Sequence, residues 1–182
     1  MVSRRSLPAL WVLLGLLSAY STARADQVDN PLYKAWASYK VESNKTLSAT
    51  LTVGAGIEVK NQITATLKAV ADDHVTVEIV SSSTVNGQSH QGPPRSENYP
   101  AKIDDKSLQD GGSDTVAAMG KTFNCKVLTV AGTAAGTVTA RNAKVWVSDG
   151  VPGGVVKIEA SGARPGGPPT TMTWIITAFE TK

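Results

Sequence analysis

The sequence predicts a mainly β protein, built on one antiparallel sheet of seven or eight strands that follow one another along the chain. Two observations predict this fold class. Apolar and polar residues alternate in several long runs, which is the period-two pattern of strands that bury one face. Short segments rich in glycine, proline and aspartate separate these runs, and such short connections favour antiparallel neighbours.

The N-terminus has the three parts of a secretory signal peptide. Arg4 and Arg5 form a positive region, residues 7–17 supply a short apolar core, and a small-residue cleavage site ends at Ala25. We therefore expect residues 1–25 to be removed and a single β-rich domain, residues 26–182, to be periplasmic or secreted. The apolar core is shorter than the roughly 20 residues that a membrane-spanning helix needs, so we expect no retained membrane span.

The charge balance excludes one class of partner. The chain has eighteen lysine and arginine residues against fifteen aspartate and glutamate residues, and three of the arginines lie within the predicted signal peptide. The remaining domain is formally neutral and has no basic run. Because nucleic-acid binding depends on neutralising phosphates with such residues, we expect no nucleic-acid partner.

The first element of the mature chain is predicted to be a short helix. Asn30 and Pro31 form a helix start, since proline is favoured at the first helical position. Leu32 and Trp36 then lie on one apolar face. The end of this segment is ambiguous, because the residues from Tyr39 onwards could equally begin a strand.

Three clearly alternating strands follow. They are predicted over residues 45–53, 57–69 and 75–85, with tight turns at residues 54–56 and 72–73. Threonine, glutamine and lysine occupy one side of each run, and valine, leucine, isoleucine and alanine the other. This pattern predicts an antiparallel meander with one buried face and one solvated face.

The middle of the chain breaks this pattern. Residues 86–100 contain several glycines and prolines and are predicted to form a loop or hairpin end. Residues 101–119 are polar and are predicted to form a solvated loop. Within it, Ser113 or Asp114 could cap a short helix over residues 115–119.

Alternation returns after residue 120. The turn at residues 149–154 has a physical cause, because its proline fixes φ near −65° and its glycines permit positive φ. A second glycine- and proline-rich connection spans residues 162–169. The strands predicted around these two connections cover residues 122–130, 137–148, 155–160 and 170–180.

The sequence offers few groups for catalysis or metal binding. His74 and His90 are the two histidines, Cys125 is the one cysteine, and none has the paired spacing of a zinc site or lies near a Gly-x-Ser-x-Gly nucleophile turn. Cys125 shares a strand face with Phe123 and Val127, which favours a buried apolar role over a reactive thiol. We therefore expect no catalytic residues, no metal and no cofactor.

Two predicted strands carry large apolar residues on both faces. Trp146 lies on the opposite face from Val145 and Val147, and Trp174 on the opposite face from Ile175. Such strands are covered on both sides, by a helix, by a second sheet or by a ligand.

Three motifs give the chain a family resemblance. They are Asn-Pro-Leu-Tyr-Lys-x-Trp-x-Ser at residues 30–38, Gly-Lys-Thr-Phe-x-Cys-Lys-Val at residues 120–127, and Lys-Val-Trp-Val-Ser-Asp-x-Val-Pro-Gly-Gly-Val-Val-Lys at residues 144–157. Together they resemble a group of small exported bacterial proteins of unknown function. The strand order is also similar to the open half-barrels of the periplasmic lipoprotein carrier LolA and its partner LolB, although the lipid-attachment cysteine of LolB is missing.

The resemblance implies a fold and a function. The implied fold is a single curved antiparallel sheet, an open half-barrel of seven to nine strands with one or two short helices. The implied function is a non-enzymatic exported protein that holds an apolar ligand, such as a lipid or acyl chain, between sheet and helices, with Trp36, Trp146 and Trp174 lining the site. The alternatives are an envelope interaction protein with a filled core and a small hydrolase.

Overall fold

The computed structural model of the protein describes residues 27–53, 57–104, 108–131, 134–135, 138–163 and 169–182. The predicted signal peptide, the predicted turn at residues 54–56 and most of the predicted connection at residues 162–169 lie outside this part of the chain. The elements are β1 (Gln27–Asp29), α2 (Pro31–Ala37), β2 (Asn44–Val53), β3 (Ile57–Val70), β4 (His74–Val85), β5 (Gln88–Gln91), β6 (Arg95–Pro100), β7 (Lys102–Asp104), β8 (Leu108–Ala118), β9 (Lys121–Ala131), β10 (Ala134–Ala135), β11 (Val138–Val147), β12 (Val155–Ala163) and β13 (Pro169–Glu180).

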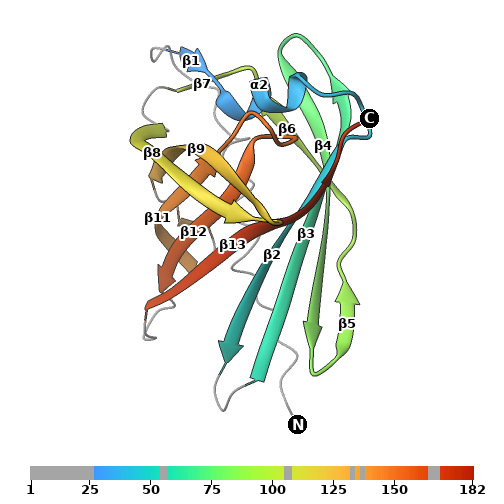
Figure 1. The fold of residues 1–182 in the computed structure, drawn as a ribbon, viewed down its shortest axis with the longest axis vertical. Coiled ribbons are helices and arrows are strands. Elements are labelled where there is room, and N and C mark those ends of the chain that lie inside the picture. Colours follow the sequence, from blue (N-terminus) through green and yellow to red (C-terminus); the bar gives the residue numbers. More distant parts are fainter. Residues whose placement is uncertain (1–26, 54–56, 105–107, 132–133, 136–137, 164–168) are drawn as a thin grey trace.

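The main sheet is antiparallel, strongly curved and open (Figure 1). Its eleven strands follow the order β5-β4-β3-β2-β13-β12-β11-β9-β8, while β6 pairs with β4 and β10 pairs with β11. A separate two-stranded sheet joins β1 to β7. The predicted fold class, a mainly β protein with an open half-barrel, is confirmed.

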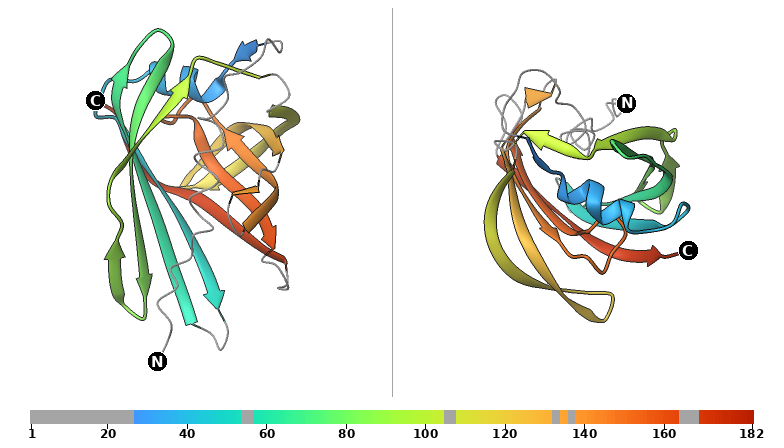
Figure 2. Two further views of the ribbon diagram at one scale, coloured as in Figure 1. Left: turned by 180° about the vertical axis from the view of Figure 1, so that it is seen from behind. Right: turned by 90° about the horizontal axis from the view of Figure 1, so that it is seen from above.

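Alternation along β2, β3 and β4 produces the predicted meander. Leu47 pairs with Ile63, which pairs with Ser81, so these three residues share one face of the sheet. On the other face, the hydroxyl groups of Thr46 and Thr64 lie 3.0 Å apart. We call the first face the inner face, because α2 lies against it, and the second the outer face (Figure 2).

The C-terminal strand β13 joins the two halves of the sheet. Only its second half, from Ile175 to Glu180, pairs with β2, where it contacts the segment from Asn44 to Ser48. The first half of β13 pairs with β12. The remaining part of β2 therefore runs on beside β3 alone, and the sheet divides into two wings that diverge in Figure 1.

The hairpin formed by β8 and β9 curls back over the outer face. Strand β8 contacts β12 and β13, neither of which is its neighbour in the sheet. Figure 2 shows this hairpin as a layer outside β11, β12 and β13. Residues on both faces of β11 are therefore buried, including Val145 and Trp146, as the apolar residues on both sides of this strand predicted.

The predictions for the middle of the chain were only partly right. Residues 86–100 were predicted to be a loop or hairpin end; residues 86–87 do turn a hairpin, but β5 and β6 on either side of the following connection pair with β4. The solvated loop predicted over residues 101–119, with a possible helix at 115–119, was wrong, because β7 and β8 lie there and β8 pairs with β9 up to Ala118. Polar residues are tolerated in β5 and β8 because most of their side chains are exposed.

The predicted short helix is present as α2. The side chain of Asn30 accepts a hydrogen bond from the Leu32 backbone N–H at 3.0 Å, and Pro31 occupies the first turn. Leu32, Ala35 and Trp36 are buried against the inner face of the sheet. The helix lies at one end of the half-barrel, while β2 to β5 extend towards the other end (Figure 1).

Candidate functional site: the inner face of the half-barrel

The inner face of β2, β3 and β4 changes character along its length. Near α2 it is apolar and buried, because Leu67 pairs with Val77 and Ala65 pairs with Ile79. Further along β4 the inward positions are serines, Ser81 and Ser83, which are half-buried. Along the same direction of β2 and β3 the inner face keeps small or apolar residues apart from Asn61, and of these Ala49 and Val59 are buried.

A row of aligned residues marks this change. Ala49 pairs with Asn61, Asn61 pairs with Ser83, and Ser83 pairs with His90. Directly paired residues share a face, so the row crosses four strands on the inner side. Asn61 and Ser83 are half-buried and His90 is exposed. Their side chains form no hydrogen bond to any other residue that the structure describes. These polar groups are therefore available to water or to a ligand.

The opposite end of the inner face is closed by α2 and by the connection between β11 and β12. We call residues 149–154 the floor loop. Although it is a turn, its central residues Val151 and Pro152 are fully buried. The backbone N–H of Gly153 donates to the carbonyl of Ala35 at 3.3 Å, which attaches the loop to α2.

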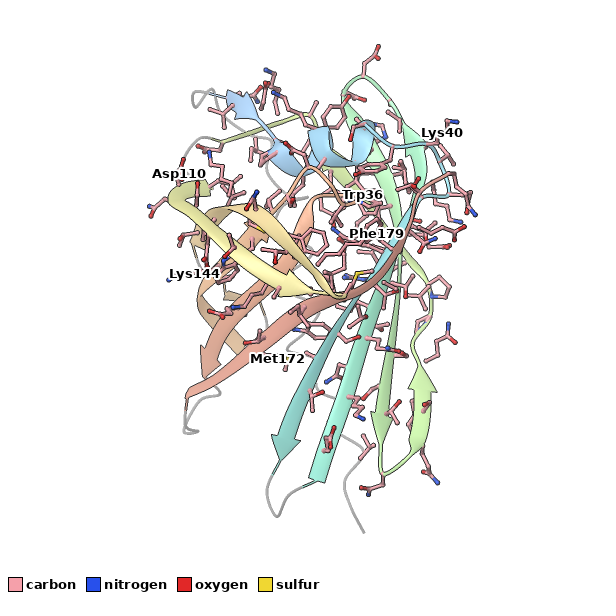
Figure 3. All side chains as sticks on the ribbon, viewed as in Figure 1. Trp36, Lys40, Asp110, Lys144, Met172 and Phe179 are labelled. Atoms are coloured by element: carbon pink, nitrogen blue, oxygen red, sulfur yellow. The ribbon has the colours of Figure 1, made fainter. Side chains whose placement is uncertain are left out.

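Gly153 is required by its contact with Trp36. Its φ is +64°, and a Cβ atom there would lie 2.2 Å from Cε2 of the indole. Both the left-handed backbone and the absence of space exclude other residues. Figure 3 shows Trp36 inside the space enclosed by α2 and the curved sheet.

Lys45 lies beneath the floor loop. Its side chain is buried, with only 2% of the residue exposed, and Nζ donates to the carbonyl of Gly153 at 3.1 Å. Nζ also lies 5.1 Å from the centre of the Trp36 ring, within the range of a cation–π contact. Among the described residues, no carboxylate pairs with Lys45. Burial lowers the pKa of this lysine to about 7.

A second buried polar group lies on β6. Arg95, Glu97 and Tyr99 pair with Ile79, Val77 and Val75 and so face inwards. The Glu97 carboxylate lies 2.7 Å from Nη1 of Arg95 and accepts a hydrogen bond from the Tyr99 hydroxyl at 3.2 Å. Burial raises the pKa of Glu97, and it raises the pKa of Tyr99 well above the usual value. These three side chains form a compact ionic group at the side of the inner face.

The three tryptophans proposed from the sequence do not share one site. Trp174 pairs with Ile158 and lies on the inner face, as does Trp36 of α2. Trp146 pairs with Lys157, which places it on the outer face. Trp36 and Trp174 therefore lie on the same side of the sheet and are both buried, whereas Trp146 faces the other way.

Protein groups cover Trp146. Its indole N–H donates to a carboxylate oxygen of Asp114 on β8 at 2.9 Å, and the ammonium of Lys157 lies 4.4 Å from the ring centre. The hydrogen bond from Trp146 is also the largest influence that lowers the pKa of Asp114. The contact ties the curled hairpin to β11.

The predicted role of Cys125 is confirmed. It is buried on the same face as Phe123 and Val127, and burial raises the pKa of its thiol. His74 begins β4 and contacts Asp73, while His90 lies on β5 beside the far end of β4. Cys125 lies on β9, in the other half of the sheet. The structure does not bring these three residues together.

The described part of the chain contains no group of three or more His, Cys, Asp or Glu residues that could hold a metal ion. It also contains no helix with the length and hydropathy needed to cross a membrane.

Sequence reasoning missed two inward-facing polar residues that the pattern itself could have identified. Lys45 and Leu47 have the same parity on β2, so the alternation already places Lys45 on the buried face. Asn61 likewise interrupts the apolar series between Val59 and Ile63 on β3. Both residues are polar and stand at positions that the alternation assigns to the buried face, and this mismatch could have identified them from the sequence.

Together these features define an open antiparallel half-barrel with a closed floor and a polar row on its inner face. No protein-family model, no curated protein and no solved structure matches the chain. The likeness to LolA and LolB and to small exported bacterial proteins therefore stays a prediction from the sequence.

Proposed function

We propose that the protein is an exported, non-enzymatic binding protein of the cell envelope that holds a lipid or another acyl-chain ligand against the inner face of the half-barrel. The observation that carries this proposal is the row Ala49, Asn61, Ser83 and His90. It brings polar side chains that have no hydrogen-bond partner among the described residues next to an apolar sheet surface. This combination fits an amphipathic molecule better than a purely apolar or a purely polar one.

The arrangement of the two parts favours one orientation of the ligand. An acyl chain would lie along the inner face near Val59, Ile63 and Trp174, which are apolar and come from both wings of the sheet. A hydroxyl, amide or ester group would then reach Asn61 and Ser83. Trp36 and the floor loop would form the closed end.

The charge of the inner face favours a neutral ligand head. Asn61 and Ser83 carry no charge, and on the same face Arg95 and Glu97 form an ion pair whose opposite charges offset each other. Among the residues that the structure describes, the buried lysine of the inner face, Lys45, lies beneath the floor loop and not in the polar row.

The experiment is native mass spectrometry of the mature protein, residues 26–182, purified from an exporting host without detergent, followed by organic extraction of the same sample. The proposal predicts protein ions with an additional mass and recovery of the matching lipid in the extract. Ions of the ligand-free protein alone, with no lipid in the extract and no uptake of added fatty acid, would contradict it.

An envelope interaction protein with a filled core is the second candidate. The observation that favours it is the coverage of Trp36 by Gly153 and of Trp146 by Asp114 and Lys157, since both indoles are buried by protein groups. This candidate predicts no bound lipid and stable capture of an envelope protein, so the same mass spectra separate the two.

A further inference from the structure

We propose that Lys45 is a proton-controlled latch on the floor loop: the loop stays closed against α2 while the amine is neutral, and protonation of the amine favours release of the loop. This inference concerns the closed end of the half-barrel and does not depend on ligand binding by the inner face.

The geometry around Lys45 is unfavourable for a charge. An ammonium group carries three donors, and the described protein groups offer Nζ one acceptor, the Gly153 carbonyl at 3.1 Å. That carbonyl also accepts from the backbone N–H of Val155 at 2.8 Å, so it does not depend on the lysine. The Trp36 ring, 5.1 Å from Nζ, compensates only a part of the lost hydration.

The charged and titratable groups around this site have other partners. On β6, Glu97 and Tyr99 interact with Arg95 and with each other. At the exposed end of the floor loop, the Tyr39 hydroxyl donates to the carbonyl of Asp149. The charged groups at the edges of α2, β3 and β13 form ion pairs at the surface, namely Lys34 with Asp29, Lys68 with Glu42 and Glu78, and Lys182 with Glu180.

The floor loop is attached by few hydrogen bonds. Gly153 donates to Ala35 over a long 3.3 Å, and the other contacts with α2 are packing contacts, of Gly153 on Trp36 and of Gly154 near Ala35, whose Cβ would lie 3.0 Å from a Cβ at Gly154. Moving the loop outwards breaks these contacts but leaves β11 and β12 paired below it. It also gives water access to Nζ of Lys45.

The direction of the effect follows from the two protonation equilibria. In the closed state the pKa of Lys45 is about 7, whereas a hydrated lysine has 10.5. Between these values opening takes up one proton, so the opening equilibrium constant rises about tenfold for each unit by which the pH falls. Below about pH 7 both states are protonated and the constant no longer changes. Opening is therefore most favoured at neutral and acidic pH and suppressed at alkaline pH.

The test is amide hydrogen exchange of the mature protein, measured by NMR between about pH 7 and pH 9.5 and corrected for the intrinsic exchange rate. The readouts are the amides of Gly153, Gly154 and Val155, with the amides of Leu67 and Ile63 on β3 as reporters of global unfolding. We expect the protection of the loop amides to be lower than that of β3 and to rise about tenfold per pH unit.

Two variants isolate Lys45. In Lys45→Met the protection of the loop amides should become independent of pH and should exceed the wild-type value at pH 7. Lys144→Met, which removes an exposed charge on β11 (Figure 3), should keep the wild-type pH dependence.

Three results would overturn the proposal. They are a wild-type loop protection that does not change with pH, a Lys45→Met variant that retains the wild-type slope, and loop amides that are protected as strongly as those of β3. If Lys45→Met fails to fold, the pH dependence of loop protection in the wild type and an NMR titration of Lys45 Nζ still test the proposal. A titration midpoint near 10.5 would contradict the latch.

Discussion

The indole of Trp36 occupies the space that a side chain at Gly153 would need. A Cβ atom there would lie 2.2 Å from Cε2 and 2.4 Å from Nε1 of the ring, and the φ of Gly153 is +64°. A residue of α2 and a residue of a turn more than a hundred positions later in the chain therefore fit only as a pair. This pair closes one end of the half-barrel.

Gly153→Ala should destabilise the protein by about 3 to 5 kcal/mol, because the new methyl group overlaps the indole and the left-handed backbone is strained. The measurement is the free energy of unfolding by urea titration. Gly87→Ala is the matched control, since Gly87 has a φ of +79° but nothing within 4 Å of its Cβ position. This control should lose only the free energy that corresponds to left-handed backbone strain, about 1 to 2 kcal/mol. Equal losses for the two variants would show that the contact with Trp36 is unimportant.

The Gly153 substitution should be less harmful once the indole is removed. Trp36→Ala alone should cost about 3 to 5 kcal/mol, because a buried aromatic residue is lost from the core. In that background Gly153→Ala should cost no more than its backbone strain. The double-mutant cycle over the four proteins measures this coupling. Additive losses would place the two residues out of contact.

Lys45 should make the stability of the protein depend on pH above neutrality. Its pKa is about 7 in the folded protein and 10.5 when hydrated. Between these values the unfolded chain holds a proton that the folded protein lacks, so the free energy of unfolding rises with pH by about 1.4 kcal/mol per unit. Below about pH 7 this contribution is constant at its lowest value. Urea titrations at several pH values measure the slope.

Lys45→Met should remove that slope and should be at least as stable as the wild type at pH 7. Methionine is similar in length and needs no hydration, and the Gly153 carbonyl keeps its hydrogen bond from Val155. Lys144→Met should retain the wild-type slope. A Lys45→Met protein with an unchanged slope would assign the pH dependence to another group.

Cys125 should react with a water-soluble disulfide reagent only when the protein unfolds. It is 4% exposed, and burial raises the pKa of its thiol, so little thiolate is accessible near neutral pH. The reaction is followed by absorbance in buffer and in denaturing urea. Fast modification of the native protein would contradict the buried position of this residue on the inner side of the curled hairpin.

The sequence predicted those parts of the fold whose pattern is local. Period-two alternation located β2, β3 and β4, and the Asn30 and Pro31 start signal located α2. The buried position of Cys125 followed from the same alternation. In each case neighbouring residues along the chain carry the relevant information.

The parts that the sequence did not predict depend on contacts between distant segments. Strand β8 is polar, and it is a strand because β9 pairs with it. The faces of Trp146 and Trp174 follow from a register that places β13 between β2 and β12. Residues 149–154 form a buried loop because they pack against Trp36. The local sequence of the turn does not indicate this contact.

The most direct test of the proposed function is a fluorescence titration of the delipidated mature protein with cis-parinaric acid, a fluorescent acyl chain. Ser83→Phe fills the inner face beside Asn61, while the matched control Ser82→Phe places the same ring on the outer face of the same strand. We expect saturable binding to the wild type, at least about a tenfold weaker affinity for Ser83→Phe, and little change for Ser82→Phe. Absence of saturable binding to the wild type, or equal affinities for both variants, would contradict it.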